Sequence, residues 1–221
     1  MTLSQLTCNE TARLLNGRNN PQAAAISHLA VAAARAAESL VYLADLDDCR
    51  FRGIWPIDAY SNNTVDDAHV RWAATSALTS IDLCIACAAR LGNFSNAKTG
   101  GEASVRNYYS VSHLGKVTDK RNLVPNPWRT WIDGVVDDHD YHRLLRVRNA
   151  LVHADAIRHG YGTTDSISSH SMRFGYNIGP LQPPVGPVTH LHVSAREVVE
   201  LSRDTSSLHV RCFIATLAKL P

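Results

Sequence analysis

The sequence has little excess charge and few cysteines. Its 221 residues carry 22 Lys and Arg against 20 Asp and Glu, a formal net charge of +2. Such a small excess argues against a protein that binds nucleic acid mainly through bulk electrostatics, so any contact with RNA or DNA has to be local. Five cysteines form an odd set, which favours reduced thiols over a disulfide framework.

Long hydrophobic runs are also missing. No stretch approaches the roughly 18 uncharged apolar residues that predict a membrane span, and Met1–Asn20 lacks the pattern of a secretory leader. These features predict a soluble, cytoplasmic protein without membrane contact. Because 45% of the residues are hydrophobic, we expect a single domain over residues 1–221 with a sizeable core.

One cysteine pair has metal-like spacing. Cys84 and Cys87 are separated by two residues, as in half of a zinc site, but the sequence offers no second such pair. The surrounding residues are typical of a buried helix, so we expect these cysteines to pack in the core. We expect no metal and no cofactor.

The spacing of apolar residues predicts an all-α fold, an antiparallel bundle of four to five helices. The four principal helices are expected over Pro21–Asp48, Thr64–Leu91, Asp137 or Asp138 to Ile157 or Arg158, and Ser194–Leu220. Capping-box pairs, Thr64 with Asp67 and Ser194 with Glu197, predict two of the helix starts. Trp128 and Trp131 are expected to anchor the entry to the third helix.

The first of these helices is rich in alanine. Its apolar face is predicted to hold Ile26, Leu29, Ala33, Ala36, Leu40 and Leu43. Arg35, Glu38 and Tyr42 are predicted to point away from that face.

Two segments interrupt the helical pattern. Residues 92–127 contain the Gly100-Gly101 break and a short candidate helix over Ser104–Leu114. An insertion at about residues 159–193 is rich in Gly, Ser and Pro, which excludes a helix there. Alternation in Val188–Val193 predicts a strand, paired as a hairpin with Met172–Tyr176.

The third helix carries an arginine where a leucine is expected. Arg148 is predicted to lie at the centre of an apolar face, which is formed by Tyr141, Leu144, Leu145, Leu151 and Val152. Asn149 and His153 flank this face, and His142 and Arg146 extend the polar stripe. A guanidinium there needs an anion or an aqueous cleft, because an unpaired buried charge costs several kcal/mol.

The segment from Arg148 and Asn149 to His153 resembles the motif of the HEPN superfamily: an arginine, a polar neighbour and a histidine on the third main helix of a bundle. The resemblance implies a metal-independent endoribonuclease. Histidine titrates near neutral pH and can exchange protons with the RNA 2′-hydroxyl and the leaving oxygen. Arg148 would hold the phosphate and Asn149 would orient it, while His142 and Arg146 would bind substrate.

The resemblance also implies a homodimer. One histidine cannot readily act as both base and acid, whereas in the family the motif helices of two protomers meet across a two-fold axis. Several members are toxins or antiviral defence effectors, so an antitoxin or other regulatory protein is a further candidate partner beside RNA. Asp155 stands where one branch has a tyrosine that an antitoxin enzyme modifies, which argues against control by that route.

Two other functions stay open. Asp82 lies on the apolar side of its own helix and could pair with Arg148, leaving a catalytically inactive HEPN module that binds a nucleotide or a partner protein. The run Asp137 to Asp140 contains the adjacent His-Asp of metal-dependent HD phosphohydrolases, for which His69, His113 and Asp67 are further candidate ligands. A charged helix start explains the same run.

Two weaker candidates are better explained by structure. His190 and His192 alternate on one side of the expected strand, a pair of ligands without an evident third. A basic and aromatic set could contact RNA by stacking and by binding phosphate, or simply pack in a loop. It comprises Arg106, Tyr108, Tyr109, Lys116, Lys120 and Arg121.

Overall fold

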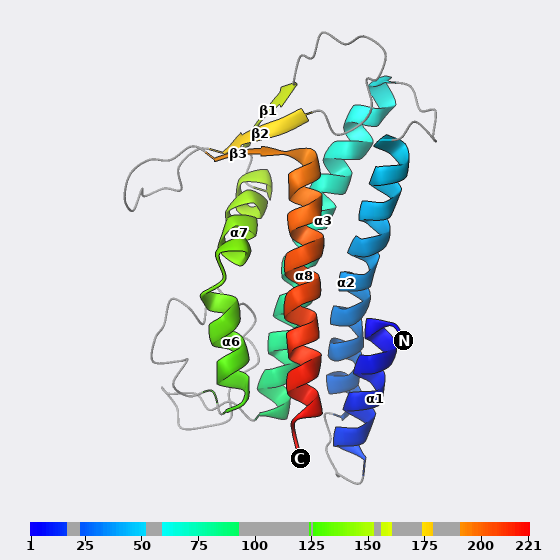
Figure 1. Ribbon diagram of the computed structural model, residues 1–221, viewed down its shortest axis with the longest axis vertical. Coiled ribbons are helices and arrows are strands. Elements are labelled where there is room, and N and C mark those ends of the chain that lie inside the picture. Colours follow the sequence, from blue (N-terminus) through cyan, green and yellow to red (C-terminus); the bar gives the residue numbers. More distant parts are fainter. Residues whose placement is uncertain are drawn as a thin grey trace. The chain divides into compact units, whose positions relative to one another are not determined.

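The protein is a bundle of helices accompanied by a small sheet. The computed structural model describes residues 1–16, 23–51, 59–92, 124, 126–152, 156–160, 174–178 and 191–221. The helices of this part of the chain are α1 (Leu3–Leu15), α2 (Ala23–Phe51), α3 (Ala59–Leu91), α6 (Trp128–Val136), α7 (His139–Val152) and α8 (Ala195–Ala218) (Figure 1). The strands are β1 (Ala156–Gly160), β2 (Phe174–Ile178) and β3 (Leu191–Ser194). The predicted all-α bundle is confirmed.

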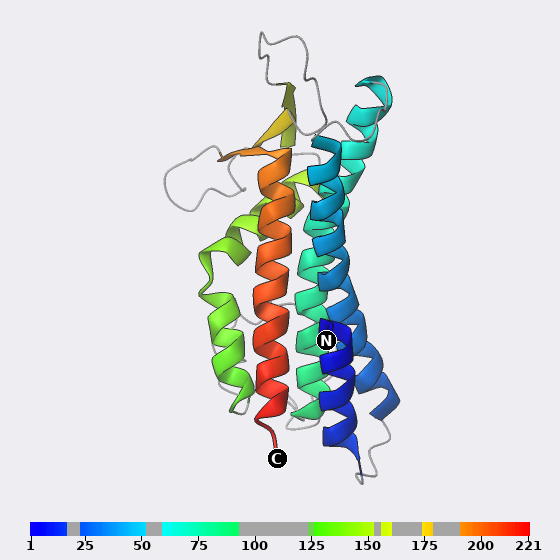
Figure 2. The ribbon, with the colours of Figure 1, turned by 45° about the vertical axis from the view of Figure 1, so that its right-hand side comes forward.

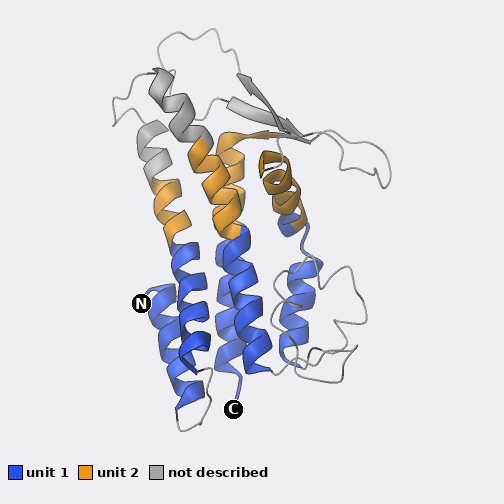
Figure 3. Cartoon of the chain, turned by 180° about the vertical axis from the view of Figure 1, so that it is seen from behind, with its two compact units in different colours: residues 1–38, 78–141, 205–221 blue, residues 39–77, 142–204 orange. Residues whose placement is uncertain are grey.

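The chain divides into two compact units, drawn in different colours in Figure 3. Unit 1 contains residues 1–38, 78–141 and 205–221, and unit 2 contains residues 39–77 and 142–204. Four helices, α2, α3, α7 and α8, contribute a segment to each unit. The expected single domain stays a prediction.

Unit 1 is held together by closely packed helices, which run side by side in Figures 1 and 2. The thiol of Cys87 on α3 donates to the carbonyl of Ile26 on α2 at 3.6 Å. The hydroxyls of Ser80 on α3 and Ser206 on α8 lie 2.6 Å apart and are fully buried. Small side chains at these positions let the helix backbones approach closely.

The buried face of α2 differs in part from the predicted one. Ile26, Ala33, Leu40 and Leu43 are buried as expected, whereas Leu29 and Ala36 are only half-buried. The alanines that complete the face are Ala30, Ala34 and Ala37. Hydrophobicity cannot distinguish a core alanine from a surface one, because alanine suits both, so the exact orientation of an alanine-rich helix depends on its neighbours. Arg35 and Tyr42 are exposed, as predicted.

Several helix boundaries differ from those expected. The helix α3 begins at Ala59, so Thr64 lies inside it and the capping role predicted for Thr64 and Asp67 is wrong. Sequence reasoning missed α1, although Thr2 and Gln5 form a capping box at its start. It also missed α6, a helix of nine residues that contains both tryptophans of the expected anchor.

The predicted start of α8 is confirmed by its hydrogen bonds. Glu197 donates its backbone N–H to Ser194 Oγ at 3.1 Å, and the Glu197 carboxylate accepts the Ser194 N–H at 2.7 Å. This reciprocal pair satisfies two donors that a helix start otherwise leaves unpaired. The helix ends at Ala218, two residues before the expected Leu220.

The end of α7 was predicted wrongly. The helix ends at Val152, and residues 156–160, part of which was assigned to that helix, form β1. The expected hairpin is confirmed as the antiparallel pair β2 and β3, in which Tyr176 faces Val193. The strand β1 adds to β2, with Arg158 opposite Tyr176, in the order β1-β2-β3. The five residue pairs between β1 and β2 outweigh the local helix propensity of residues 156–160.

Among the described residues, two helices are long and apolar enough to cross a membrane. The spans are Ala23–Asp45 and Ala68–Leu91, and an apolar window of 18 residues within each is 33% and 67% buried within the protein. Core helices of soluble proteins have the same length and composition, so these windows are weak evidence for a membrane span.

Candidate functional site

The motif helix α7 begins at a capping aspartate. Asp138 Oδ1 accepts the backbone N–H of Asp140 at 3.0 Å, which satisfies a donor in the first turn. The predicted start at Asp137 or Asp138 is therefore confirmed. Trp128, from the preceding α6, stacks on Phe213 of α8 with ring centroids 5.7 Å apart, and the Trp131 ring packs against Phe213 at a tilt with centroids 5.4 Å apart.

Arg148 lies beside the buried face of α7, and its predicted place at the centre of that face is wrong. The side chains that are buried there are those of Tyr141, Leu144, Val147, Ala150 and Leu151. Their mean direction is turned by roughly 60° from that of Arg148 on a helical wheel. Arg148 is half-buried, and Val152 beyond it is 53% exposed. The guanidinium therefore lies where the helix meets water.

The remaining motif residues are only partly described. Asn149 is half-buried next to Arg148, Arg146 is half-buried, and His142 is exposed. His153 lies outside the described residues. Within the described part of α7, the predicted polar stripe is accessible from solvent at His142 and at the half-buried side chains.

A second arginine reaches the same end of α7. Arg71 of α3 donates through Nη1 to the backbone carbonyl of Leu151, a contact within unit 2. Carbonyls in the last turn of a helix lack intrahelical partners, and a cation is favourable there. Arg71 thus brings positive charge to the turn that precedes His153. Sequence reasoning missed it because no local pattern links residues eighty positions apart.

An ion pair joins α7 to the start of α8. Arg143 lies 3.6 Å from the carboxylate of Glu197, which also takes part in the α8 capping box. Their side chains are 30% and 52% exposed, so this ion pair contributes little to stability.

The structural alternative for Arg148 remains a prediction. Asp82 is half-buried on α3 and belongs to unit 1, whereas Arg148 belongs to unit 2. A guanidinium at the edge of the buried face can be hydrated, which removes the strongest reason to expect a fully buried counter-ion.

The His-Asp run at residues 137–140 forms the start of a helix. Asp138 caps α7 and its other oxygen, Oδ2, lies 2.7 Å from Nε2 of His209. The His139 side chain is 90% exposed and lies 3.6 Å from Asp140. These roles account for the run without a metal ion, so the geometry does not favour an HD phosphohydrolase.

The paired cysteines are core residues, as predicted. Cys84 and Cys87 are completely buried. Burial raises the pKa of the Cys84 thiol well above its usual value, and it raises the pKa of Cys87 to about 12. Both thiols therefore lack the exposed, electropositive surroundings that make a cysteine reactive. In the part of the chain that the structure describes, no three His, Cys, Asp or Glu residues form a group that could hold a metal ion.

Several predicted features lie outside the described residues. His190, His113 and Asp155 are among them. So are the candidate helix Ser104–Leu114 and the basic and aromatic set between Arg106 and Arg121.

Comparisons with known proteins give no family assignment. No protein-family model matches the chain, and neither the curated proteins nor the solved structures contain a match.

Proposed function

We propose that this protein is a metal-independent endoribonuclease of the HEPN type, which acts in the cytoplasm as a homodimer. The observation that carries the proposal is the placement of Arg148: a half-buried guanidinium at the solvent edge of α7, next to Asn149 and one turn from the exposed Val152. Such an arginine can bind a phosphate without first losing its hydration entirely.

The proposed chemistry needs no group beyond those of the chain and RNA. One His153 takes the proton of the 2′-hydroxyl, whose oxygen then attacks the adjacent phosphorus. The bond from phosphorus to the 5′-oxygen breaks, and a second His153, from the partner copy, protonates the departing oxygen. The products are a 2′,3′-cyclic phosphate and a 5′-hydroxyl. Arg148 stabilises the charge that develops on the phosphate oxygens.

Individual exposed apolar side chains of unit 2, above all Val152, support the proposal of a homodimer. Val152 is 53% exposed beside Arg148, and Trp72 and Tyr42 of the same unit are 45% and 67% exposed. Large apolar side chains left in water favour burial against another surface. A second copy that covers Val152 would also bring a second His153 toward the first.

The experiment incubates the full chain with end-labelled RNA in excess chelator. We expect cleavage that leaves cyclic-phosphate ends, and a loss of about 10²–10⁴-fold in rate for His153→Ala. The matched control is His139→Ala, because His139 is an exposed histidine at the start of the same helix. Arg148→Ala is paired with Arg211→Ala, since Arg211 is an exposed arginine outside α7.

A second candidate, an inactive HEPN module that binds a nucleotide or a partner protein, is favoured by the structural use of Arg71 at the end of α7. It predicts intact RNA at high protein concentration together with mononucleotide binding that Arg148→Ala weakens. Cleavage that disappears with chelator would instead support a metal enzyme. A mass in solution that corresponds to a monomer at all concentrations would overturn the proposal that two copies of the chain form one site. Any role as a toxin or defence effector rests on the ribonuclease activity.

A further inference from the structure

A groove between α6 and α8 lies in unit 1, and none of the described residues that line it belongs to the motif. It has a volume of about 510 Å³, within the range of sites that hold small organic molecules. The buried side chains of Trp131 and His209 form part of its lining. The ring of His209 is held by Asp138 at 2.7 Å, and Trp131 Nε1 donates to the His209 carbonyl at 3.1 Å. This part of the lining is therefore preorganised.

A glycine forms part of the groove wall. Gly134 lines the groove from the last turn of α6, on the same helical face as Thr130 and Trp131. A Cβ atom built at Gly134 meets nothing within 4 Å, so close packing does not require a glycine there. In the middle of a helix a glycine costs about 0.5–1 kcal/mol relative to alanine, and within the last turn it still lacks the helix preference of alanine. The helix thus carries an unfavourable residue where a side chain would occupy the groove.

The two ends of the groove differ in chemistry. Leu208 lies on α8 and Lys219 directly follows the end of that helix, eleven residues on, which corresponds to about 16 Å at the rise of a helix. Leu208 is 54% exposed, which leaves apolar surface at one end. Lys219 is exposed at the other end, and no ion pair joins its ammonium to the described part of the chain.

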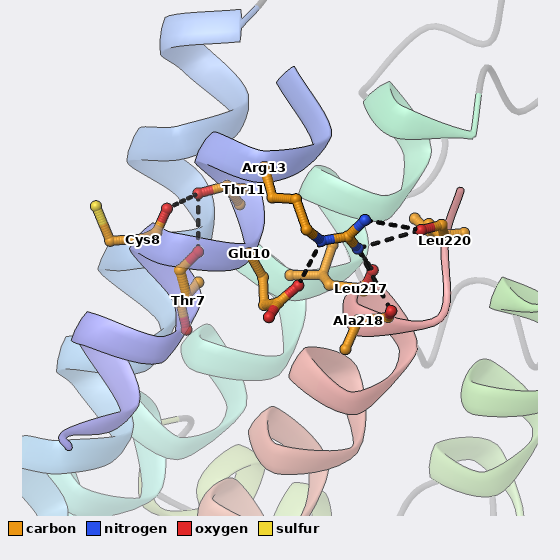
Figure 4. Close-up of polar contacts among 8 residues, drawn as sticks. All are labelled: Thr7, Cys8, Glu10, Thr11, Arg13, Leu217, Ala218 and Leu220. Carbon is orange, nitrogen blue, oxygen red and sulfur yellow. Dashed lines mark hydrogen bonds and ion pairs between the residues drawn. The ribbon is translucent and has the colours of Figure 1, made fainter. Parts of the chain in front are cut away.

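The charge of the groove selects an anion. No Asp or Glu is among the described residues that line it, so Lys219 gives it a positive end. The carbonyls at the end of α8 do not need Lys219, because the guanidinium of Arg13 donates to those of Leu217, Ala218 and Leu220 (Figure 4).

We propose that the groove between α6 and α8 binds an amphiphilic organic anion, a medium-chain carboxylate in chemical class. The apolar body would lie over Trp131 and Gly134 toward Leu208, and the carboxylate would face Lys219. The length of the groove suits a saturated chain of about twelve carbons.

The test titrates the full chain by calorimetry with laurate and dodecyltrimethylammonium below their micelle concentrations, and with dodecanol below its solubility limit. We expect one laurate per chain, with dodecanol about fivefold weaker, as is typical of an exposed charge contact. The cationic amphiphile should be weaker still. Equal affinity for all three probes, a preference for the cation, or no binding would overturn the proposal.

Four variants locate the binding. Gly134→Leu should lower the affinity for laurate at least tenfold. Gly134→Ala, which favours the helix, should keep the affinity of the parent and controls for an effect of the substitution on folding. Lys219→Gln should lower the affinity for laurate to that for dodecanol and leave the affinity for dodecanol unchanged. Arg211→Gln, which removes an exposed cation from α8, is the control and should change neither affinity. Undiminished laurate binding by Gly134→Leu would overturn the proposal. So would a dimer that this variant dissociates, since the groove would then be an interface between copies.

Discussion

His209 Nε2 lies 2.7 Å from Asp138 Oδ2, and this contact joins α8 to the residue that caps α7. The backbone carbonyl of the same histidine accepts a hydrogen bond from Trp131 Nε1 of α6. The His209 side chain is 6% exposed and that of Asp138 is 20% exposed. One buried residue of α8 therefore fixes both α6 and the start of α7, the helix that carries the proposed site.

Removal of the His209 side chain should destabilise the protein clearly. His209→Ala leaves the shielded Asp138 carboxylate without its partner, so we expect a loss of about 2–3 kcal/mol in the free energy of unfolding, measured with urea. The control His139→Ala removes a histidine that is 90% exposed and should change stability by less than about 0.5 kcal/mol. Equal effects of the two variants would contradict this role for His209.

Stability should fall in alkaline solution because of the buried thiols. Burial raises the pKa of Cys87 from 9.0 to about 12 in the folded protein, and the pKa of Cys84 is raised as well. Between these pH values the unfolded chain has lost the thiol proton while the folded chain keeps it. Stability is therefore complete below about pH 9 and declines as the pH rises, by up to about 1.4 kcal/mol per pH unit for each thiol.

The measurement compares urea unfolding at pH 7 and pH 10. The double variant Cys84→Ala/Cys87→Ala should show a smaller decline than the parent, whatever its stability at pH 7. The exposed Cys8 and Cys212 should react with a thiol reagent in the folded protein, whereas Cys84 and Cys87 should react only on unfolding. A decline of the same size in the double variant would assign the pH effect to other groups.

Arg13 should hold the end of α8 in place. Its guanidinium donates to the carbonyls of Leu217 and Leu220 at 3.0 and 3.1 Å and lies 3.0 Å from the carboxylate of Glu10 (Figure 4). Because the side chain is 44% exposed, we expect Arg13→Ala to cost only about 1 kcal/mol. Hydrogen exchange in the last turn of α8 should nevertheless become faster. Arg13→Lys should restore the slow exchange only in part, since lysine lacks the planar guanidinium that can donate to several carbonyls at once.

Arg71 should protect the last turn of α7. Arg71→Met removes the donor to the Leu151 carbonyl and keeps most of the apolar side-chain length. We expect faster hydrogen exchange over the last turn of α7 and unchanged exchange in α6. If the proposed ribonuclease is active, its rate should fall as well, because the turn before His153 is less ordered. Unchanged exchange in α7 would show that Arg71 does not stabilise this turn.

The local sequence predicted the starts of α7 and α8, which depend on local hydrogen bonds, whereas the capping box of Thr2 and Gln5 at α1 was missed. Ser194 and Glu197 bind each other's backbone, and Asp138 binds the N–H of Asp140, whatever the rest of the chain does. The core position of Cys84 and Cys87 was likewise evident from their apolar surroundings. Thr64 had the same capping pattern and failed, because α3 already begins at Ala59.

The candidate site was predicted less completely. Arg148 and Asn149 were identified by their spacing on a helix, but the orientation of α7 was not, since Val147 and Ala150 are buried and Val152 is exposed. Arg71 reaches the carbonyl of Leu151 from another helix, and no local sequence pattern predicts such a contact.

By itself the sequence determined the helical class of this protein, the capping of α7 and α8 and the position of the candidate motif, because these depend on hydrogen bonds and periodicity within a few residues. Only the tertiary structure decided that α7 gives way to β1, that Arg148 lies at the edge of the buried face, and that α6 and α8 leave a groove at Gly134. Each of these depends on surfaces supplied by segments far apart in the chain, whose packing and strand pairing outweigh local preference.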